Sequence, residues 1–174
     1  MALFQDASGR FFLRPESADD LIMRPVDETD SSVPAPGSVM IDNLLKLARF
    51  TGRQLFQARA ELGLAALSGL LSTRPGTMAS AAAALDYHLA DKIEVVIVGN
   101  AASGDSLVRE FHRAFLPNAL LAVSRKGDSR LSVFEGRQGT GTGEGAARAF
   151  VCRNSTCLLP VETAPALGRQ LAEL

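Results

Sequence analysis

The chain has 174 residues, of which 47% are hydrophobic and 21% charged, and its formal net charge is -1. This composition is typical of a globular protein with one domain or two small ones, and it excludes a disordered or fibrous chain. The balanced charge offers no basic surface for a nucleic-acid partner. Because no run of 18 apolar residues occurs and the first residues lack the pattern of a secretory signal, we expect a cytoplasmic protein with no membrane partner.

The first 37 residues are expected to be mostly irregular. Residues 9–15 are a possible short strand, and residues 24–37 form a polar segment interrupted by proline, as in a loop. Within this loop Arg24, Asp27 and Asp30 are candidates for catalytic residues, because paired carboxylates can serve as acid and base when a pocket separates their pKa values. A solvated loop is the interpretation that we prefer.

Three antiparallel helices are predicted next. Apolar residues recur at spacings of three and four over residues 38–52, with Ser38 as a candidate N-cap and Gly52 where the helix would end. A second helix is predicted over residues 54–72, and its second half is apolar or small on almost every side. An alanine-rich third helix is predicted over residues 77–91.

At residue 92 the hydrophobic pattern changes. The run IEVVIVG is typical of a strand buried on both faces. An amphipathic helix is predicted over residues 103–115, with Phe111 and Phe115 on its apolar face, and another strand over residues 118–125. A strand, a helix and a strand in this order predict a βαβ unit.

The predicted fold class is therefore α/β or α+β. A further strand over residues 147–152 and a closing helix over residues 164–174 complete the second part of the chain. We expect a helical segment over residues 1–91 joined to a small α/β segment over residues 92–174.

The turn after the first predicted strand is a possible anion-binding turn. Gly99, Ser103 and Gly104 could present backbone N–H groups to an anion where the helix begins. The turn is not a Walker loop, because Asp105 and Ser106 occupy the positions of the required Lys and Ser/Thr. A tight turn with Ser103 or Asp105 as a helix cap is the preferred interpretation.

Cys152 and Cys157 are the two cysteines of the chain, and they flank a short polar segment that we expect to be the end of a hairpin. Packed or surface thiols, a disulfide or redox-sensitive pair, and a metal site all remain open, with the first preferred. Four residues separate the cysteines, whereas a thioredoxin-type site has two, but a reversal of the chain would bring them within disulfide range. Zinc is disfavoured because His88 and His112 lie on separate predicted helices. No metal or other cofactor is expected.

Four segments taken in order resemble the C-terminal part of the spermatogenesis-associated, thioredoxin-domain-containing proteins. The similarity extends from about Gly9 to Leu171 and rests on GRFFLRPESADDLIMRPVDETD, VPAPGSVMIDNLLKLARFTG, IEVVIVG and AFVCRNSTCLLPVET. Before the first helix the chain keeps the family's residues at Pro34, Ser38 and Val39. It departs from the family pattern at Ala35, Pro36 and Gly37, where Ser, Gly and Asn are usual.

The resemblance implies a longer parent protein. Its parts would be a thioredoxin-like domain, an α/α toroid similar to sugar epimerases and six-hairpin glycosidases, and a small α/β end. This chain resembles the last helices of the toroid plus that end, and Cys152, Cys157 and Pro160 match the family's terminal motif. The redox activity of the thioredoxin domain is not carried over, because that domain is not in this chain.

Three hypotheses for function follow. The preferred one is a structural or interaction-mediating module without catalysis of its own, because three helices cannot close a ring and would leave the apolar face of residues 62–71 uncovered. Its expected partner is the missing N-terminal part of the parent protein or a second copy of this chain. The alternatives are a remnant of a sugar-directed isomerase or hydrolase that uses Arg24, Asp27 and Asp30, and a thiol redox module that uses Cys152 and Cys157.

Overall fold

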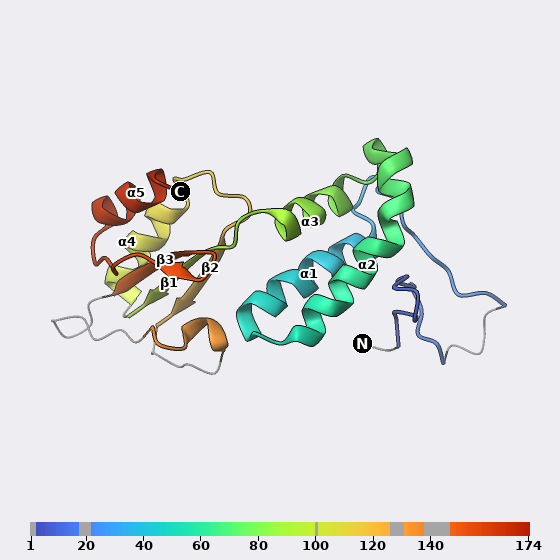
Figure 1. Ribbon diagram of the computed structural model, residues 1–174, viewed down its shortest axis with the longest axis horizontal. Helices are drawn as coiled ribbons and strands as arrows, with labels where there is room; N and C mark the ends of the chain where they lie inside the picture. The colour runs from blue at the N-terminus through green and yellow to red at the C-terminus, as the bar shows by residue number, and fades with distance from the viewer. Residues whose placement is uncertain (1–2, 18–21, 100, 126–130, 138–146) are drawn as a thin grey trace. The chain divides into compact units, whose positions relative to one another are not determined.

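The computed structural model describes residues 3–17, 22–99, 101–125, 131–137 and 147–174. In these residues it contains five α-helices and a mixed four-stranded sheet (Figure 1), which confirms the predicted class of α/β or α+β. The chain divides into two compact units. The first comprises Met1–Ala48 and Arg53–Leu89, and the second comprises Arg49–Gly52 and Ala90–Leu174.

The first unit is helical. Its elements are α1 (Pro36–Thr51), α2 (Gln54–Thr73), the 3-10 turn η1 (Pro75–Thr77) and α3 (Ala79–Leu89). The prediction that Ser38 caps α1 is wrong, since Ser38 lies buried inside the helix, which begins at Pro36. Proline suits this position because its fixed φ matches the first helical turn and it has no N–H to satisfy there. Gly52 follows α1 with a φ of 66°, the left-handed conformation that ends many helices.

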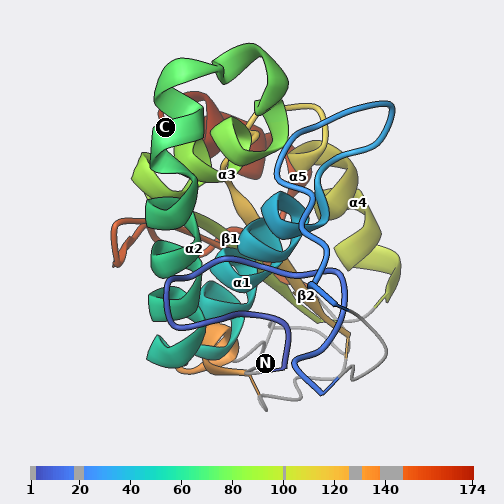
Figure 2. The same ribbon diagram turned by 90° about the vertical axis from the view of Figure 1, so that its right-hand side faces the viewer.

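The core of the helical unit lies between its three helices and an N-terminal segment. Phe11 packs against this core, whose fully buried members include Ile41, Leu44, Met78 and Ala81. The strand predicted at residues 9–15 is wrong, because the segment forms only an isolated bridge between Gln5 and Phe11. It crosses α1 and α2 as irregular chain (Figure 2). The side-chain amide of Gln5 fastens it to α2 by donating to the carbonyl oxygen of Arg59 at 3.0 Å.

The second unit is α/β. Its elements are β1 (Ile93–Val98), α4 (Ala101–Phe111), β2 (Leu120–Ser124), the 3-10 turn η2 (Ser132–Phe134), β3 (Arg148–Arg153), β4 (Thr156–Cys157) and α5 (Ala164–Ala172). The strand order is β2-β1-β3-β4. β1 and β2 are parallel and connected through α4, as predicted, while β3 and β4 join as antiparallel strands.

The two faces of the sheet are covered by different elements. Helices α4 and α5 pack over one face (Figure 1), with Leu107 and Leu167 fully buried in that layer. The opposite face is covered by η2 and by Phe50. The prediction for Phe115 is wrong: α4 already ends at Phe111, and Phe115 is 91% exposed. None of the described helices is long and apolar enough to cross a membrane.

Candidate functional site

One charged side chain interrupts the apolar sequence of β1. Side chains alternate along a strand, so Glu94 shares a face with Val96 and Val98, which pack in the layer beneath η2. Glu94 lies directly opposite Cys152 of β3 in the antiparallel register. The carboxylate therefore belongs to the face of the sheet that also carries the buried cysteine.

Cys152 and Cys157 are joined by a disulfide. They face each other in the register of β3 and β4, with their Cα atoms 3.9 Å apart. Asn154 and Ser155 form the connecting turn, and both have positive φ, as two-residue hairpin turns often require. The predicted hairpin is therefore present, and of the three interpretations left open for the cysteines the structure shows the paired one. Cys152 is only 1% exposed, whereas Cys157 is an exposed residue of the edge strand.

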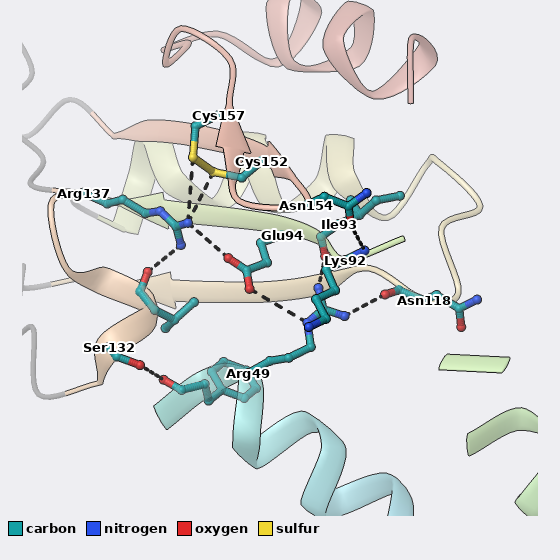
Figure 3. Close-up of polar contacts among 12 residues, drawn as sticks. Arg49, Lys92, Ile93, Glu94, Asn118, Ser132, Arg137, Cys152, Asn154 and Cys157 are labelled. Carbon is teal, nitrogen blue, oxygen red and sulfur yellow. Dashed lines mark hydrogen bonds and ion pairs between the residues drawn. A yellow bond between two sulfur atoms is a disulfide. The ribbon is translucent and has the colours of Figure 1, made fainter. Parts of the chain in front are cut away.

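Arg137 lies over the disulfide. One of its guanidinium nitrogens, Nη2, is 3.3 Å from Cys152 Sγ and 3.9 Å from Cys157 Sγ (Figure 3). The same nitrogen donates to Glu94 Oε2 at 3.1 Å, while Nη1 donates to the carbonyl oxygen of Val133 at 2.6 Å. With only 16% of its side chain exposed, Arg137 is held in one orientation beside the sulfur atoms.

Arg49 approaches Glu94 from the end of α1. Its Nε is 3.9 Å from Glu94 Oε1, and its guanidinium donates to the carbonyl oxygens of Asn118, at 3.1 Å, and Ile93 (Figure 3). The Arg49 side chain is 9% exposed. Two guanidinium groups therefore share one carboxylate in a partly buried site. We call Arg49, Glu94, Arg137, Cys152 and Cys157 the arginine–disulfide cluster.

The charges of this cluster determine which chemistry it favours. Within the cluster, the two guanidinium groups and the Glu94 carboxylate sum to one net positive charge, next to a neutral disulfide. A thiolate is stabilised by nearby cationic groups, and more strongly where water is partly excluded. The arrangement is therefore suited to a negative charge on the Cys152 sulfur.

The three catalytic candidates in the loop of residues 24–37, Arg24, Asp27 and Asp30, are not arranged as an acid–base pair. The Asp30 carboxylate accepts hydrogen bonds from the backbone N–H groups of Ala35, at 2.9 Å, and Ser80, at 2.7 Å. Burial by itself would raise the pKa of Asp30, but these hydrogen bonds outweigh it and hold the pKa below the ordinary value. Arg24 donates to the carbonyl oxygens of Leu3 and Arg14. Asp27 is exposed, and no contact between it and the other two candidates is observed among the described residues.

Gly99, Ser103 and Gly104, the candidates for an anion-binding turn, have structural roles in the part of the turn that the structure describes. The Ser103 hydroxyl accepts a hydrogen bond from the backbone N–H of Ala147 at 2.9 Å, which ties α4 to the start of β3. Ser103 and Asp105 both lie inside α4, so neither is its N-cap. Gly99 has a φ of 141° and donates its N–H to Ser124 at the end of β2. Gly104 is buried in the helix.

Neither histidine belongs to a group of metal ligands in the described part of the chain. There, no three His, Cys, Asp or Glu side chains come together in a way that could hold a metal ion. His88 lies on α3, where its ring is 3.3 Å from the side-chain amide of Gln57. His112 packs its ring edge-on against Phe111.

A second feature of the surface is a groove between α2 and α3. It has a volume of about 370 Å³ and is lined by Glu61, Leu64, Ala65, Ser68, Leu71, Ser72, Leu85, His88 and Leu89. The α2 members recur at spacings of three and four, so they form one stripe along the helix. The apolar face expected to be uncovered is partly covered, since Leu64 and Leu67 are buried. We call this feature the α2–α3 groove.

Sequence reasoning missed Arg49, Glu94 and Arg137. The signal for Glu94 is visible in the sequence, because a carboxylate within a strand buried on both faces needs a partner. No local pattern indicates Arg49 and Arg137, because they lie in different segments that meet only in the folded unit.

No family model matches this chain. It is 30% identical to human spermatogenesis-associated protein 20 over 168 residues, and 28% identical to the mouse protein of the same name. Each match covers 91% of this chain but 21% of the relative. The chain thus spans about a fifth of the length of the curated relatives it matches. The resemblance found in the sequence is confirmed, and the chain is homologous to a part of spermatogenesis-associated protein 20.

Proposed function

We propose that this chain is a structural and interaction-mediating module without catalysis of its own. In this proposal the helical unit packs against a helix contributed by the rest of the parent protein, and the α2–α3 groove receives that helix. The observation that carries the proposal is the groove itself, an apolar channel whose α2 stripe has the spacing of a helix-packing face.

The proposed occupant is an amphipathic helix from the parent protein. The relatives extend far beyond the matched segment, and the family resemblance implies that the extension contains helices of an α/α toroid. Leu71, Leu85 and Leu89 would contact apolar residues of the incoming helix. Glu61 is the acidic residue of the groove lining, so a basic residue on that helix would complement it.

The proposal can be tested with the remaining part of human spermatogenesis-associated protein 20, purified as a separate polypeptide. Ala65 lines the groove and is exposed, so Ala65→Arg fills the groove without disturbing the core. Ala83→Arg is the matched control, because Ala83 is exposed on α3 outside the groove lining. Light scattering should detect a complex of the combined mass, weakened about tenfold or more by Ala65→Arg and unchanged by Ala83→Arg.

Two outcomes would contradict the proposal. The first is the absence of a complex, or a complex that both variants weaken equally. The second is self-association of this chain that only Ala65→Arg abolishes, because a second copy would then occupy the groove. The sugar-directed alternative has no comparable support, since Arg24 and Asp30 both bind backbone groups in the described part of the chain.

A further inference from the structure

The arginine–disulfide cluster carries an inference that goes beyond docking and does not depend on it. We propose that Cys152 and Cys157 form a thiol–disulfide exchange site, in which a thiol reductant attacks Cys157 and Arg137 stabilises the thiolate that departs from Cys152. The co-reactant is a thiol compound. The same chemistry can come from a small monothiol, such as glutathione, or from a dithiol, and the test separates the two.

Access determines which sulfur is attacked. Cys157 belongs to the exposed edge strand β4, whereas Cys152 lies within β3 and is 1% exposed. An attacking thiolate must approach along the line of the sulfur–sulfur bond, from the side opposite the leaving sulfur. For Cys157 this approach starts from the exposed edge strand, whereas for Cys152 it would start from the side of β1, where Glu94 lies opposite Cys152 in the register. Cys157 is therefore the sulfur that receives the incoming thiolate.

The position of Arg137 decides how well the other sulfur departs. Exchange is faster when the leaving thiol has a low pKa, because its thiolate is then more stable. Arg137 Nη2 is 3.3 Å from Cys152 Sγ, closer than its 3.9 Å to Cys157 Sγ, so the guanidinium favours charge on Cys152. Its side chain is 16% exposed, which limits screening by water.

Glu94 and Arg49 complete the electrostatic balance. Glu94 orients Arg137 through the 3.1 Å hydrogen bond, but its negative charge alone would cancel the effect of that guanidinium. Arg49, 3.9 Å from the other oxygen of Glu94, restores one net positive charge to the cluster. Glu94 thus acts as a positioning residue for Arg137, and Arg49 offsets the charge of Glu94.

The exchange transfers two electrons from the reductant to the cysteine pair. A thiolate of the reductant forms a bond to Cys157 Sγ, and the bond between Cys157 and Cys152 breaks, with its electron pair leaving on Cys152. With a dithiol, the second thiolate then attacks the sulfur of the first and releases Cys157, which takes up a proton. The cysteine pair gains two electrons, and the dithiol is oxidised to a disulfide. A monothiol stops at the mixed disulfide on Cys157 until a second molecule reacts.

The first experiment measures the rate at which dithiothreitol reduces the pair in the purified full chain. Samples are quenched with iodoacetamide and analysed by mass spectrometry. Arg137→Gln should slow reduction about fivefold to tenfold, because the leaving thiolate loses its cation, and Arg137→Lys should retain most of the rate. Arg148→Gln is the matched control, since Arg148 lies on β3 but pairs with Glu162 at 2.8 Å.

The second measurement separates a chemical role of Arg137 from a structural one. In the Cys157→Ser variant, the pH dependence of the ultraviolet absorbance of the thiolate reports the pKa of Cys152, which is too buried for an alkylation assay. We expect a pKa below the ordinary value and an increase of about one unit when Arg137→Gln is added. Circular dichroism establishes that each variant is folded before it is compared.

A third measurement identifies the attacked sulfur and the source of the thiol. Brief treatment with glutathione should leave a trapped adduct on Cys157, whereas a dithiol should give the fully reduced pair without an adduct. Equal reduction rates for the original chain and Arg137→Gln would overturn the proposal. An adduct on Cys152, or an ordinary pKa for Cys152 that Arg137→Gln does not change, would overturn it as well.

Discussion

Asp30 and Ser80 are fifty residues apart in the chain, yet the Asp30 carboxylate accepts a hydrogen bond from the Ser80 backbone N–H at 2.7 Å. The other carboxylate oxygen binds the N–H of Ala35, next to the start of α1. One side chain thus serves the first turns of two helices and fastens the irregular loop to both. Asp30 is a structural residue of the helical unit.

Replacement of Asp30 should destabilise the protein. In Asp30→Asn the amide group can accept at only one of the two positions, so one backbone N–H loses its partner. We expect a loss of about 2 kcal/mol in the free energy of unfolding, measured by urea denaturation at pH 7. Asp27→Asn, in the same loop and exposed, is the control and should change stability by less than about 0.5 kcal/mol.

The same carboxylate predicts a dependence of stability on pH. Hydrogen bonding to the charged form, which outweighs the opposite effect of burial, lowers the pKa of Asp30 in the folded state below the ordinary value of 3.8. Its stabilisation is therefore complete above about pH 4 and is lost as the pH falls through the folded pKa. The original chain should lose more stability than Asp30→Asn over this range. Parallel pH curves for the two proteins would contradict the assignment.

Gly9 should not tolerate a side chain. Its φ is 93°, and a Cβ atom at this position would lie 2.8 Å from Leu62 Cγ and against the Leu62 backbone oxygen. Gly9→Ala should cost about 3 kcal/mol, because the N-terminal segment would have to leave α2. Gly69→Ala within α2 is a useful contrast, since no atom lies within 4 Å of its Cβ. That change should stabilise the helix by up to about 1 kcal/mol in the same denaturation assay.

Asn154 joins the hairpin turn to the start of β1. Its side-chain oxygen accepts from the Lys92 N–H at 2.9 Å, and its own N–H donates to the Lys92 oxygen at 3.0 Å. Its side-chain nitrogen also binds Asp91, and this hydrogen bond, with Arg153 as the next cause, lowers the pKa of Asp91. Asn154→Ala should therefore raise the Asp91 pKa toward its ordinary value, as measured by NMR titration of the carboxyl group.

The free energies of unfolding of Asn154 variants separate the contribution of the side-chain hydrogen bonds from that of the backbone conformation. The residue has a φ of 49°, which glycine adopts without cost and alanine does not. Asn154→Gly should lose only the side-chain hydrogen bonds, about 1 kcal/mol, whereas Asn154→Ala should lose about 2 kcal/mol. If alanine and glycine were equally destabilising, the backbone conformation of the turn would have no part in the effect.

Arg49 and Glu94 should show strong energetic coupling. Removing Arg49 takes one of two guanidinium groups from the partly buried Glu94, which keeps its contact with Arg137, so Arg49→Met should cost about 2 kcal/mol. The double variant with Glu94→Gln should lose at least about 1 kcal/mol less than the sum of the single changes. The exposed pair Lys46 and Asp42 provides the comparison, with an expected coupling below about 0.5 kcal/mol. Similar coupling energies for the two pairs would contradict the buried role of Glu94.

Most of the secondary structure of this protein can be predicted from local sequence patterns. The apolar spacing in α1 and α2, the β-branched run of β1 and the order of strand, helix and strand each reflect local patterns. Local chemistry also placed the hairpin between the two cysteines. The predicted start of α1 and end of α4 differ from the structure, because helix termini depend on neighbouring backbone groups as well as on residue type.

The arginine–disulfide cluster, in contrast, is assembled by contacts that exist only in the folded unit. Arg49, Glu94 and Arg137 are separated by more than forty residues from one another, and no periodicity relates them. Their contacts depend on strand register, which pairs Glu94 with Cys152, and on the chain returning over that face of the sheet. An unpaired charge in a partly buried site is costly, so the three charged side chains stabilise the unit only when the fold brings them together. No local stretch of sequence contains that information.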